Sequence, residues 1–372
     1  MFCKRPGAAT FFLIAALLGL VACTPRGPLT LVSDAGEIGT VQDVFTATTR
    51  ARTNGGLGGS ERSEVPDYTK LSISVPPDRS PGSITFPKGT PDPATDFLVT
   101  AAQAFTDGPA FRRNLSQALA RTPADDREVI VYVHGFNNTF AEGVLRIAQL
   151  DHDIELPGVA VHYSWPSSGN PLGYAYDRDS ALFARDGLEQ LIGEIRRAGP
   201  RRITLVAHSM GALLTMETLR QMAIARPGTV HRQIDAVVLL SPDIDIDLFR
   251  AQAHRIGTLP PEFVIFTSER DRALALSARL TGQRERLGNI TNPADVSDLT
   301  VTLIDVTAFS SGVGHFVAGS SPALIQIFRQ IPSVERAFQR DRSGRAGLFP
   351  GTVLTIQNAT EIILSPNAAL SR

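Results

Sequence analysis

Cysteine is nearly absent from this chain of 372 residues, which contains only Cys3 and Cys23. We expect Cys3 to be removed with an N-terminal signal, so the mature chain would have one cysteine. An internal disulfide and a cysteine-based metal site are then excluded. Excess charge is also lacking, because 36 Lys and Arg residues against 37 Asp and Glu residues give a net charge of −1. Without a basic stripe interleaved with aromatic residues, the sequence gives no support for binding to nucleic acid.

The N-terminal apolar run is too short to form a permanent membrane span. It covers residues 11–22, follows Lys4 and Arg5, and is typical of a signal peptide over residues 1–22. The run ends in Leu-Val-Ala-Cys at Cys23, which resembles the lipobox of bacterial lipoproteins, where the cysteine is lipidated. Thr24, rather than an aspartate, follows the cysteine, which is similar to lipoproteins sorted to the outer membrane. We therefore predict an envelope protein anchored at Cys23 and facing the periplasm; an ordinary cleavable signal is the alternative.

The rest of the chain has the composition of a folded protein, with 43% apolar and 20% charged residues. We predict a tether over residues 23–40 and one large domain over residues 41–345. A glycine-rich stretch near residues 51–66 is expected to be a mobile loop. Residues 346–372 are expected to form a peripheral tail that contains a possible hairpin.

Apolar, β-branched runs alternate with helical patterns along the domain. Strong strands are predicted at residues 129–133, 159–164, 203–207, 236–240, 263–268 and 299–304, and shorter ones at 41–44 and 71–75. Two helical pieces are predicted between residues 95 and 121, on either side of residues 107–109. Such alternation implies crossover connections. The fold class is therefore α/β, with a mostly parallel central sheet and helices on both faces.

A sharp turn between a strand and a helix is predicted at Ser209. The run before it is buried and β-branched, and the residues after Gly211 have helical composition. The pattern matches the nucleophile elbow G-x-S-x-G, except that Ala207 replaces the first glycine. Another small residue still allows the helix to approach the strand closely. Ser209 is therefore the candidate nucleophile, and a serine in an ordinary connection is the alternative.

A second turn, at residues 134–138, follows the strand at 129–133. In acyl transfer, the oxyanion that develops on the attacked carbonyl needs hydrogen-bond donors. We predict the backbone N–H groups of Met210, at the start of the elbow helix, and of Phe136, after the small residue Gly135, as these donors. His134 is expected to brace the turn rather than take part in chemistry.

A serine hydroxyl needs a base, and the order of residues along the chain narrows the choice. In hydrolases with this elbow, the order is serine, then an acid, then histidine. Only His231, His254 and His315 follow Ser209. His315 is the one that comes after the last predicted parallel strand, in a loop rich in serine and glycine. We therefore predict His315 as the general base.

Two aspartates remain candidates for the acid that orients this histidine. Asp271 lies three residues beyond the strand at 263–268, and Asp243 follows the strand at 236–240. The acids at 243, 245 and 247 could also be read as a calcium loop. However, Leu248 stands where such a loop requires glycine, and His254 where it requires glutamate. We therefore predict no metal site.

Together these motifs resemble the α/β-hydrolase superfamily. More narrowly, the chain is similar to the bacterial group catalogued as domain of unknown function 900, which is described as esterase/lipase-like. The resemblance extends from about residue 41 to 330. It depends on residues 44–50 (VFTATTR), 133–137 (VHGFN), 164–167 (SWPS), Tyr176 with Asp179, residues 207–211 (AHSMG) and 241–245 (SPDID).

The resemblance implies the α/β-hydrolase fold and a serine hydrolase without metal or organic cofactor. In the superfamily, the strand nearest the histidine loop more often supplies the acid, which favours Asp271 over Asp243. We expect hydrolysis of a small-molecule or lipid ester through an acyl-enzyme on Ser209. The alternatives are an acyltransferase or a peptidase with the same residues, or an envelope binding protein that keeps the fold without turnover.

Overall fold

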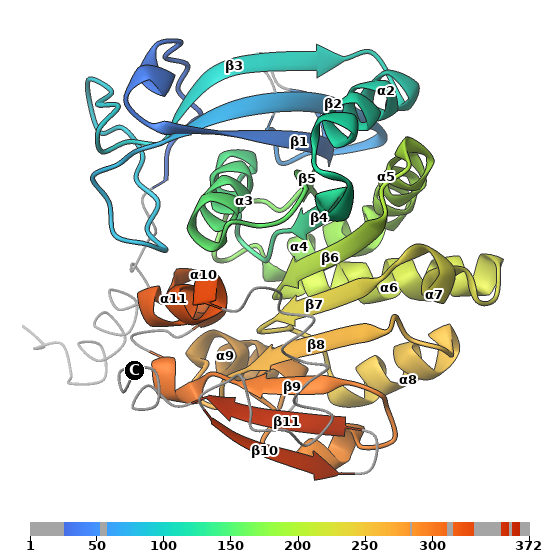
Figure 1. Ribbon diagram of the computed structural model, residues 1–372. Coiled ribbons are helices and arrows are strands. Elements are labelled where there is room, and N and C mark those ends of the chain that lie inside the picture. Colours follow the sequence, from blue (N-terminus) through green and yellow to red (C-terminus); the bar gives the residue numbers. More distant parts are fainter. Residues whose placement is uncertain are drawn as a thin grey trace, which may run out of the picture.

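One large sheet forms the centre of the molecule (Figure 1). The computed structural model describes residues 26–52, 58–282, 285–310, 315–330, 351–356 and 359–364. The signal peptide, Cys23, the centre of the glycine-rich stretch and residues 311–314 of the histidine loop lie outside these ranges. The sheet has eleven strands in the order β10-β11-β9-β8-β7-β6-β4-β5-β1-β2-β3.

The strands in chain order are β1 (Thr40–Arg50), β2 (Arg62–Val75), β3 (Leu98–Phe105), β4 (Glu128–Val133), β5 (Val159–Ser164), β6 (Arg202–His208), β7 (Ala236–Leu240), β8 (Glu262–Thr267), β9 (Thr302–Asp305), β10 (Gly351–Ile356) and β11 (Ala359–Leu364). The α-helices are α2 (Gly108–Arg121), α3 (Phe140–Ile154), α4 (Tyr174–Phe183), α5 (Arg185–Ala198), α6 (Met210–Ala225), α7 (Thr229–Gln233), α8 (Ile246–Ile256), α9 (Arg272–Leu280), α10 (Val317–Ser320) and α11 (Pro322–Gln330). Short 3₁₀ turns are η1 (Ala35–Glu37), η2 (Ala124–Asp126), η3 (Leu287–Asn289), η4 (Pro293–Val296) and η5 (Thr307–Phe309).

The inner strands run parallel and are buried on both faces. Adjacent strands pair in parallel from β1 through β5, β4, β6, β7, β8 and β9 to β11. Helices α2, α5, α6 and α8 pack on one face, while α3, α10 and α11 lie on the other (Figure 1). Parallel strands covered on both sides need nearly continuous apolar runs. The predicted fold class is therefore confirmed.

Residues 23–40 were expected to form a free tether, but the described part of this segment is packed against the fold. From residue 26 onward the chain packs along the sheet: Leu31 pairs with Val99 and Ala35 is fully buried. The Ser74 hydroxyl donates to the carbonyl oxygen of Ala35. Glycine and threonine content suggested a chain that cannot pack, yet small residues also allow a close approach to a neighbouring strand.

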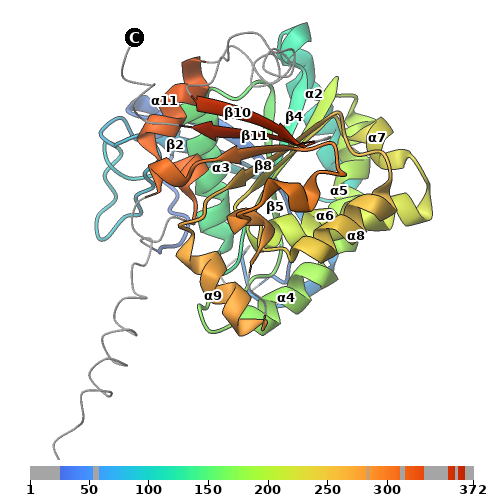
Figure 2. The ribbon, with the colours of Figure 1, turned by 90° about the horizontal axis from the view of Figure 1, so that it is seen from below.

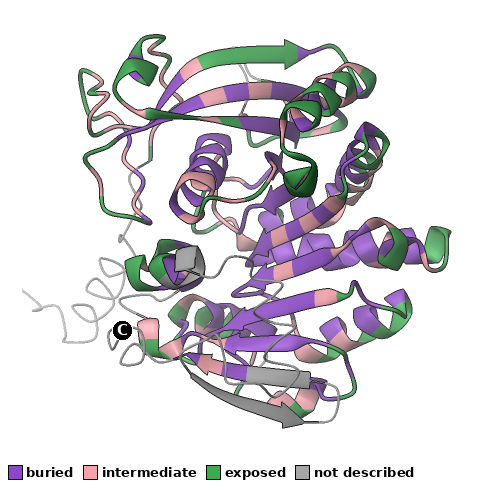
Figure 3. Cartoon of the chain, in the orientation of Figure 1, coloured by how far each residue is buried: buried purple, intermediate pink, exposed green. Residues whose placement is uncertain are grey.

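Two further expectations near the N-terminal edge were wrong. The loop expected at residues 51–66 ends at Arg62, where the long strand β2 begins, and β2 accepts Pro66 within its length. The first of the two expected helical pieces is instead strand β3, which pairs with β2. Its middle residues are largely exposed (Figure 3). Alanines favour a helix locally, but pairing with β2 satisfies the backbone of this segment and outweighs that preference.

The C-terminal hairpin exists and belongs to the central sheet rather than to a peripheral tail. Strands β10 and β11 pair antiparallel, and β11 continues the parallel array beside β9. The domain boundary predicted at residue 345 is therefore misplaced. Within the part of the chain that the structure describes, no helix has the length and apolarity required to span a bilayer.

Candidate active site

Ser209 lies at a strained turn between β6 and α6. Its backbone has φ 53° and ψ −121°, a conformation that non-glycine residues rarely adopt. Gly211 is required beside it, because a Cβ there would lie 2.3 Å from the carbonyl oxygen of His134. Ala207 is fully buried, so a small residue fits where the motif usually has its first glycine. The local geometry is that of a nucleophile elbow.

Three side chains from distant loops form one hydrogen-bonded chain with this serine. The Ser209 hydroxyl lies 2.9 Å from Nε2 of His315, and Nδ1 of His315 donates to Oδ2 of Asp271 at 2.8 Å. Asp271 is fully buried, and its second oxygen accepts the backbone N–H of Leu274 at 3.0 Å. Asp271 therefore caps α9 while it holds one tautomer of His315. The structure thus brings together the three residues singled out in the sequence.

The alternative acid, Asp243, makes other contacts. Its carboxylate accepts hydrogen bonds from the hydroxyls of Tyr174 at 2.9 Å and Ser277 at 2.6 Å. Nε of Arg286 lies 3.2 Å from Oδ1 of Asp243, and both side chains are buried. Asp243 thus belongs to a buried polar cluster behind α9, and Asp271 is the acid bonded to His315.

The two expected oxyanion donors lie at turns that meet beside Ser209. Val133 at the end of β4 pairs with Ala207 at the end of β6, so the turns after these strands are neighbours. A Cβ on Gly135 would lie 2.9 Å from Cβ of Ser209, which shows how closely the first turn approaches the serine. Met210 is the first residue of α6, and such a residue has no intrahelical partner for its N–H.

The pKa values of the two histidines beside Ser209 are shifted in opposite directions. Burial works against the charged form of His315, but the charge and hydrogen bond of Asp271, helped by Asp243, outweigh it and raise the pKa of His315 above 6.5. Burial and the neighbouring His315 hold the pKa of His208 well below the ordinary value. His208 is therefore neutral, and its Nε2–H donates to the backbone oxygen of His315 at 3.2 Å. This bond holds the backbone of His315 in place.

A buried arginine that the sequence reasoning did not single out holds the loops around the site. Arg50, at the end of β1, is 2% exposed, and burial lowers its pKa to about 10. Its guanidinium donates to Ser164 Oγ and to the backbone oxygens of Gly59, Ser167 and Asn138. It lay within the quoted stretch at residues 44–50, but a single arginine at a strand end gives no signal of burial.

His134 and Asp177 complete this support. The ring of His134 stacks on Trp165 with centroids 4.9 Å apart, and Nε1–H of Trp165 donates to the His134 carbonyl oxygen at 2.7 Å. The carboxylate of Asp177, on α4, accepts from the N–H of Asn137 at 3.1 Å and from the Ser167 hydroxyl at 2.5 Å. His134 therefore braces its turn as expected, whereas Asp177 was missed in favour of its neighbour Asp179.

We expect Arg50→Met to lower the free energy of unfolding by about 3 to 5 kcal/mol. The substitution leaves three backbone oxygens without their donor, and each such loss costs about 1–3 kcal/mol. Chemical denaturation followed by circular dichroism measures the change. Arg52→Met is the control, because Arg52 is largely exposed and pairs with Asp67 at the surface, so its replacement should have little effect. Equal stability of the two variants would contradict the structural role of Arg50.

A cavity of about 450 Å³ opens beside this chain of side chains. Both Phe136 and His315 line it, together with the aromatic rings of Phe86, Phe309 and Phe316. Polar side chains contribute about as much of the lining and include Asn138, Glu142, Arg146 and His208. The aromatic rings beside His315 suit the apolar part of a ligand, and the polar groups can fix its orientation.

Comparison with known proteins identifies the family. Residues 109–331 match the family described as "Alpha/beta hydrolase of unknown function (DUF900)". The chain belongs to this family. The family match and the parallel sheet together show an α/β-hydrolase, as the sequence motifs predicted.

Two individual proteins are also similar to this α/β-hydrolase. An uncharacterised protein of Nostoc sp. strain PCC 7120 is 40% identical over 63 residues, which are 17% of this chain and 16% of that protein. The chain therefore matches only a small part of the length of this relative. A lipase-esterase related protein from Clostridium acetobutylicum ATCC 824 is 14% identical, with a TM-score of 0.25, over 55% of this chain and 83% of that protein.

Proposed function

We propose that this hydrolase cleaves carboxylic esters by nucleophilic attack of Ser209, in the bacterial envelope and anchored through Cys23. The observation that carries the proposal is the hydrogen-bonded chain from Ser209 Oγ through both ring nitrogens of His315 to the buried Asp271. A serine hydroxyl is a weak nucleophile until a base accepts its proton, and this arrangement supplies an oriented base.

In the proposed reaction, Nε2 of His315 takes the proton of Ser209 as its Oγ bonds to the acyl carbon. The N–H groups of Phe136 and Met210 stabilise the resulting oxyanion. When the ester bond breaks, His315 returns the proton to the departing alkoxide. Water, deprotonated by His315, then attacks the acyl carbon, and His315 returns this proton to Ser209 Oγ as the bond to the serine breaks and the acid is released. Transfer to a second alcohol is a variant of this last step.

Labelling with a fluorophosphonate tests the nucleophile. The reagent forms a stable phosphonyl ester with an activated serine, and peptide mass spectrometry locates it. We expect one adduct, on Ser209, that is lost when the protein is unfolded before labelling. Absence of the adduct in folded protein, while a known serine hydrolase is labelled in parallel, would refute the proposal. A peptide panel tested beside an ester panel separates an esterase from a peptidase.

Activity should depend on pH with a midpoint above 6.5. His315 acts only when neutral, so kcat/KM for a soluble ester should rise as pH rises through the raised pKa of His315. The effect on stability has the opposite sign. The charged His315 pairs with Asp271, so that its contribution is complete below 6.5 and is lost as pH rises through the folded-state pKa. A pH profile of kcat/KM checks the first statement, and a midpoint below 6.5 would contradict it.

A further inference from the structure

Helix α9 turns a basic and apolar face to solvent directly after Asp271. Leu276 is 44% exposed and Leu280 is 65% exposed. Arg270 and Arg272, at its start, and Arg279, near its end, are exposed too. Leucine and arginine on the outer face of a helix are typical of helices that lie at a membrane interface.

The loop before α4 extends this surface. Leu172 in this loop is 89% exposed. The hydroxyl of Tyr174, two residues later, lies 2.8 Å from the Ser277 hydroxyl of α9. This contact places the loop beside α9, and Figure 2 shows α4 and α9 next to each other. The exposed leucines of both elements therefore lie on one side of the molecule.

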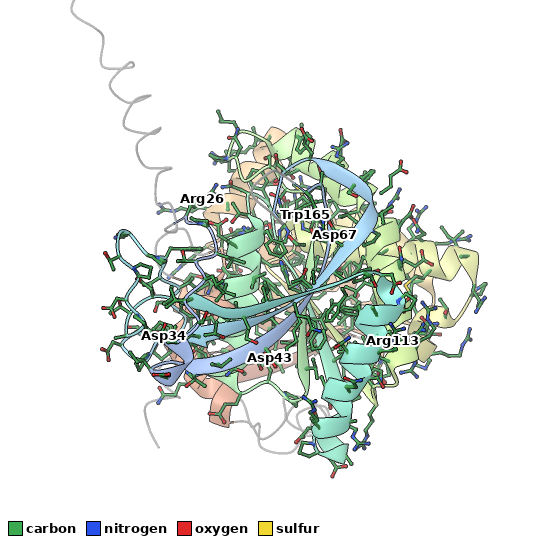
Figure 4. All side chains as sticks on the ribbon, turned by 90° about the horizontal axis from the view of Figure 1, so that it is seen from above. Arg26, Asp34, Asp43, Asp67, Arg113 and Trp165 are labelled. Carbon is green, nitrogen blue, oxygen red and sulfur yellow. The ribbon has the colours of Figure 1, made fainter. Side chains whose placement is uncertain are left out.

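The first described residue, Arg26, is held at the same side. Its guanidinium donates to the backbone oxygen of Gly169, three residues before Leu172, and to both oxygens of Asn137, at 2.9 and 2.7 Å. It also lies 3.5 Å from Glu142, which lines the cavity. Figure 4 shows Arg26 toward the periphery, with Trp165 further inside. The N-terminal segment thus meets the fold at the edge of the cavity.

Chain length then limits where an anchor at Cys23 could be. Cys23 precedes Arg26 by three residues. A fully extended residue spans at most about 3.6 Å, so the Cα atoms of these two residues are within roughly 11 Å of each other. A lipid attached to Cys23 would enter the bilayer close to the cavity.

We propose that Leu172 and the outer face of α9, which we call the rim, dock on the surface of an anionic lipid bilayer. The substrate would then be an ester lipid drawn from that bilayer into the cavity. This inference rests on the proposed ester hydrolysis by Ser209. The leucines enter the apolar boundary, while the exposed arginines attract anionic headgroups. Asp271, the residue before α9, is bonded to His315, and the ring of Tyr174 contacts Phe136, which lines the cavity. Docking of the rim therefore brings the lipid surface toward His315 and the cavity.

The first experiment compares two triple variants of the full chain. The rim variant carries Leu172→Ser, Leu276→Ser and Leu280→Ser. The control carries Leu31→Ser, Ile38→Ser and Ile224→Ser, which remove exposed apolar groups that belong neither to α9 nor to the loop before α4. Hydrolysis is measured on two substrates. One is a water-soluble short-chain ester, and the other is a diacylglycerol embedded in vesicles of phosphatidylcholine and phosphatidylglycerol. We expect the rim variant to lose at least about tenfold on the vesicle ester and to keep wild-type activity on the soluble ester.

The second experiment tests the charges by flotation in a Cys23→Ser background, where no acyl anchor holds the protein. Arg272→Glu with Arg279→Glu should abolish binding to vesicles that contain phosphatidylglycerol. Arg226→Glu with Arg255→Glu, a pair of exposed arginines elsewhere, should leave it unchanged. The Cys23→Ser protein with its arginines intact should bind more weakly as salt is added. It should not bind to vesicles of pure phosphatidylcholine.

The outcomes separate the two proposals. Equal rates of the rim and control variants on the vesicle ester, with soluble-ester hydrolysis intact, would overturn the docking surface and leave the esterase standing. If the unmodified protein hydrolyses neither ester and takes no fluorophosphonate, the esterase fails, and the ester lipid as substrate fails with it. Flotation that is insensitive to the charge reversal at α9 would overturn the docking surface in either case.

Discussion

Replacing Ser209 with alanine is expected to lower kcat for ester hydrolysis by a factor of about 10⁶, the scale seen when a serine hydrolase loses its nucleophile. The cause is specific to this position. Both ring nitrogens of His315 are already committed, Nε2 to Ser209 and Nδ1 to Asp271. Without the hydroxyl, His315 has no nucleophile to deprotonate except water. Residual activity would come from binding and from the oxyanion donors alone.

Ser241→Ala is the matched control for this substitution. Ser241 also follows a parallel strand, is buried and has a positive φ of 44°. It shares the backbone strain of Ser209 without its bond to His315, so its replacement should leave kcat within about threefold of the original, since it removes no reacting group. Steady-state kinetics on a soluble ester measures both variants. Activity retained in the Ser209 variant would point instead to a binding protein with a hydrolase fold.

Replacing Asp271 with asparagine is expected to lower kcat by about 10⁴, because the amide stabilises the wrong tautomer of His315. Asparagine has nearly the same shape and can still accept the N–H of Leu274, so α9 should keep its cap. The negative charge that raises the pKa of His315 is lost. The residual activity should therefore show its pH midpoint at a lower value. A pH profile of the variant separates this positioning role from a loss of fold.

Asp243→Asn provides the comparison that decides between the two acids. Asp243 is paired with the buried Arg286, and breaking a buried pair costs about 3–5 kcal/mol of stability. We expect this variant to unfold more easily and, while folded, to turn over at a rate much closer to the original protein. If Asp243→Asn instead caused the larger loss of kcat in folded protein, Asp243 would be the functional acid.

The sequence alone predicted the architecture of the sheet centre, and it pointed to Ser209 and His315 as candidate site residues. Continuous apolar runs can be satisfied only by strands covered on both faces, so β4 to β9 were predictable from composition. The elbow at Ser209 could be seen because its small residues are demanded by local backbone geometry. Chain order then pointed to His315. The strands and the elbow are local features, since each depends on residues adjacent in sequence, whereas His315 was chosen by the order of motifs along the chain.

The tertiary structure decided which contacts form between residues that are far apart in the sequence. Asp243 and Asp271 both follow strands, and only the loop positions show which carboxylate meets His315. Arg50 became a central support only when β1 paired with β5 and buried its guanidinium. Strand β3 and the hairpin of β10 and β11 follow from edge pairing, which overrides local preference because it satisfies backbone groups. Sequence thus specified the chemical groups, and long-range packing selected their partners.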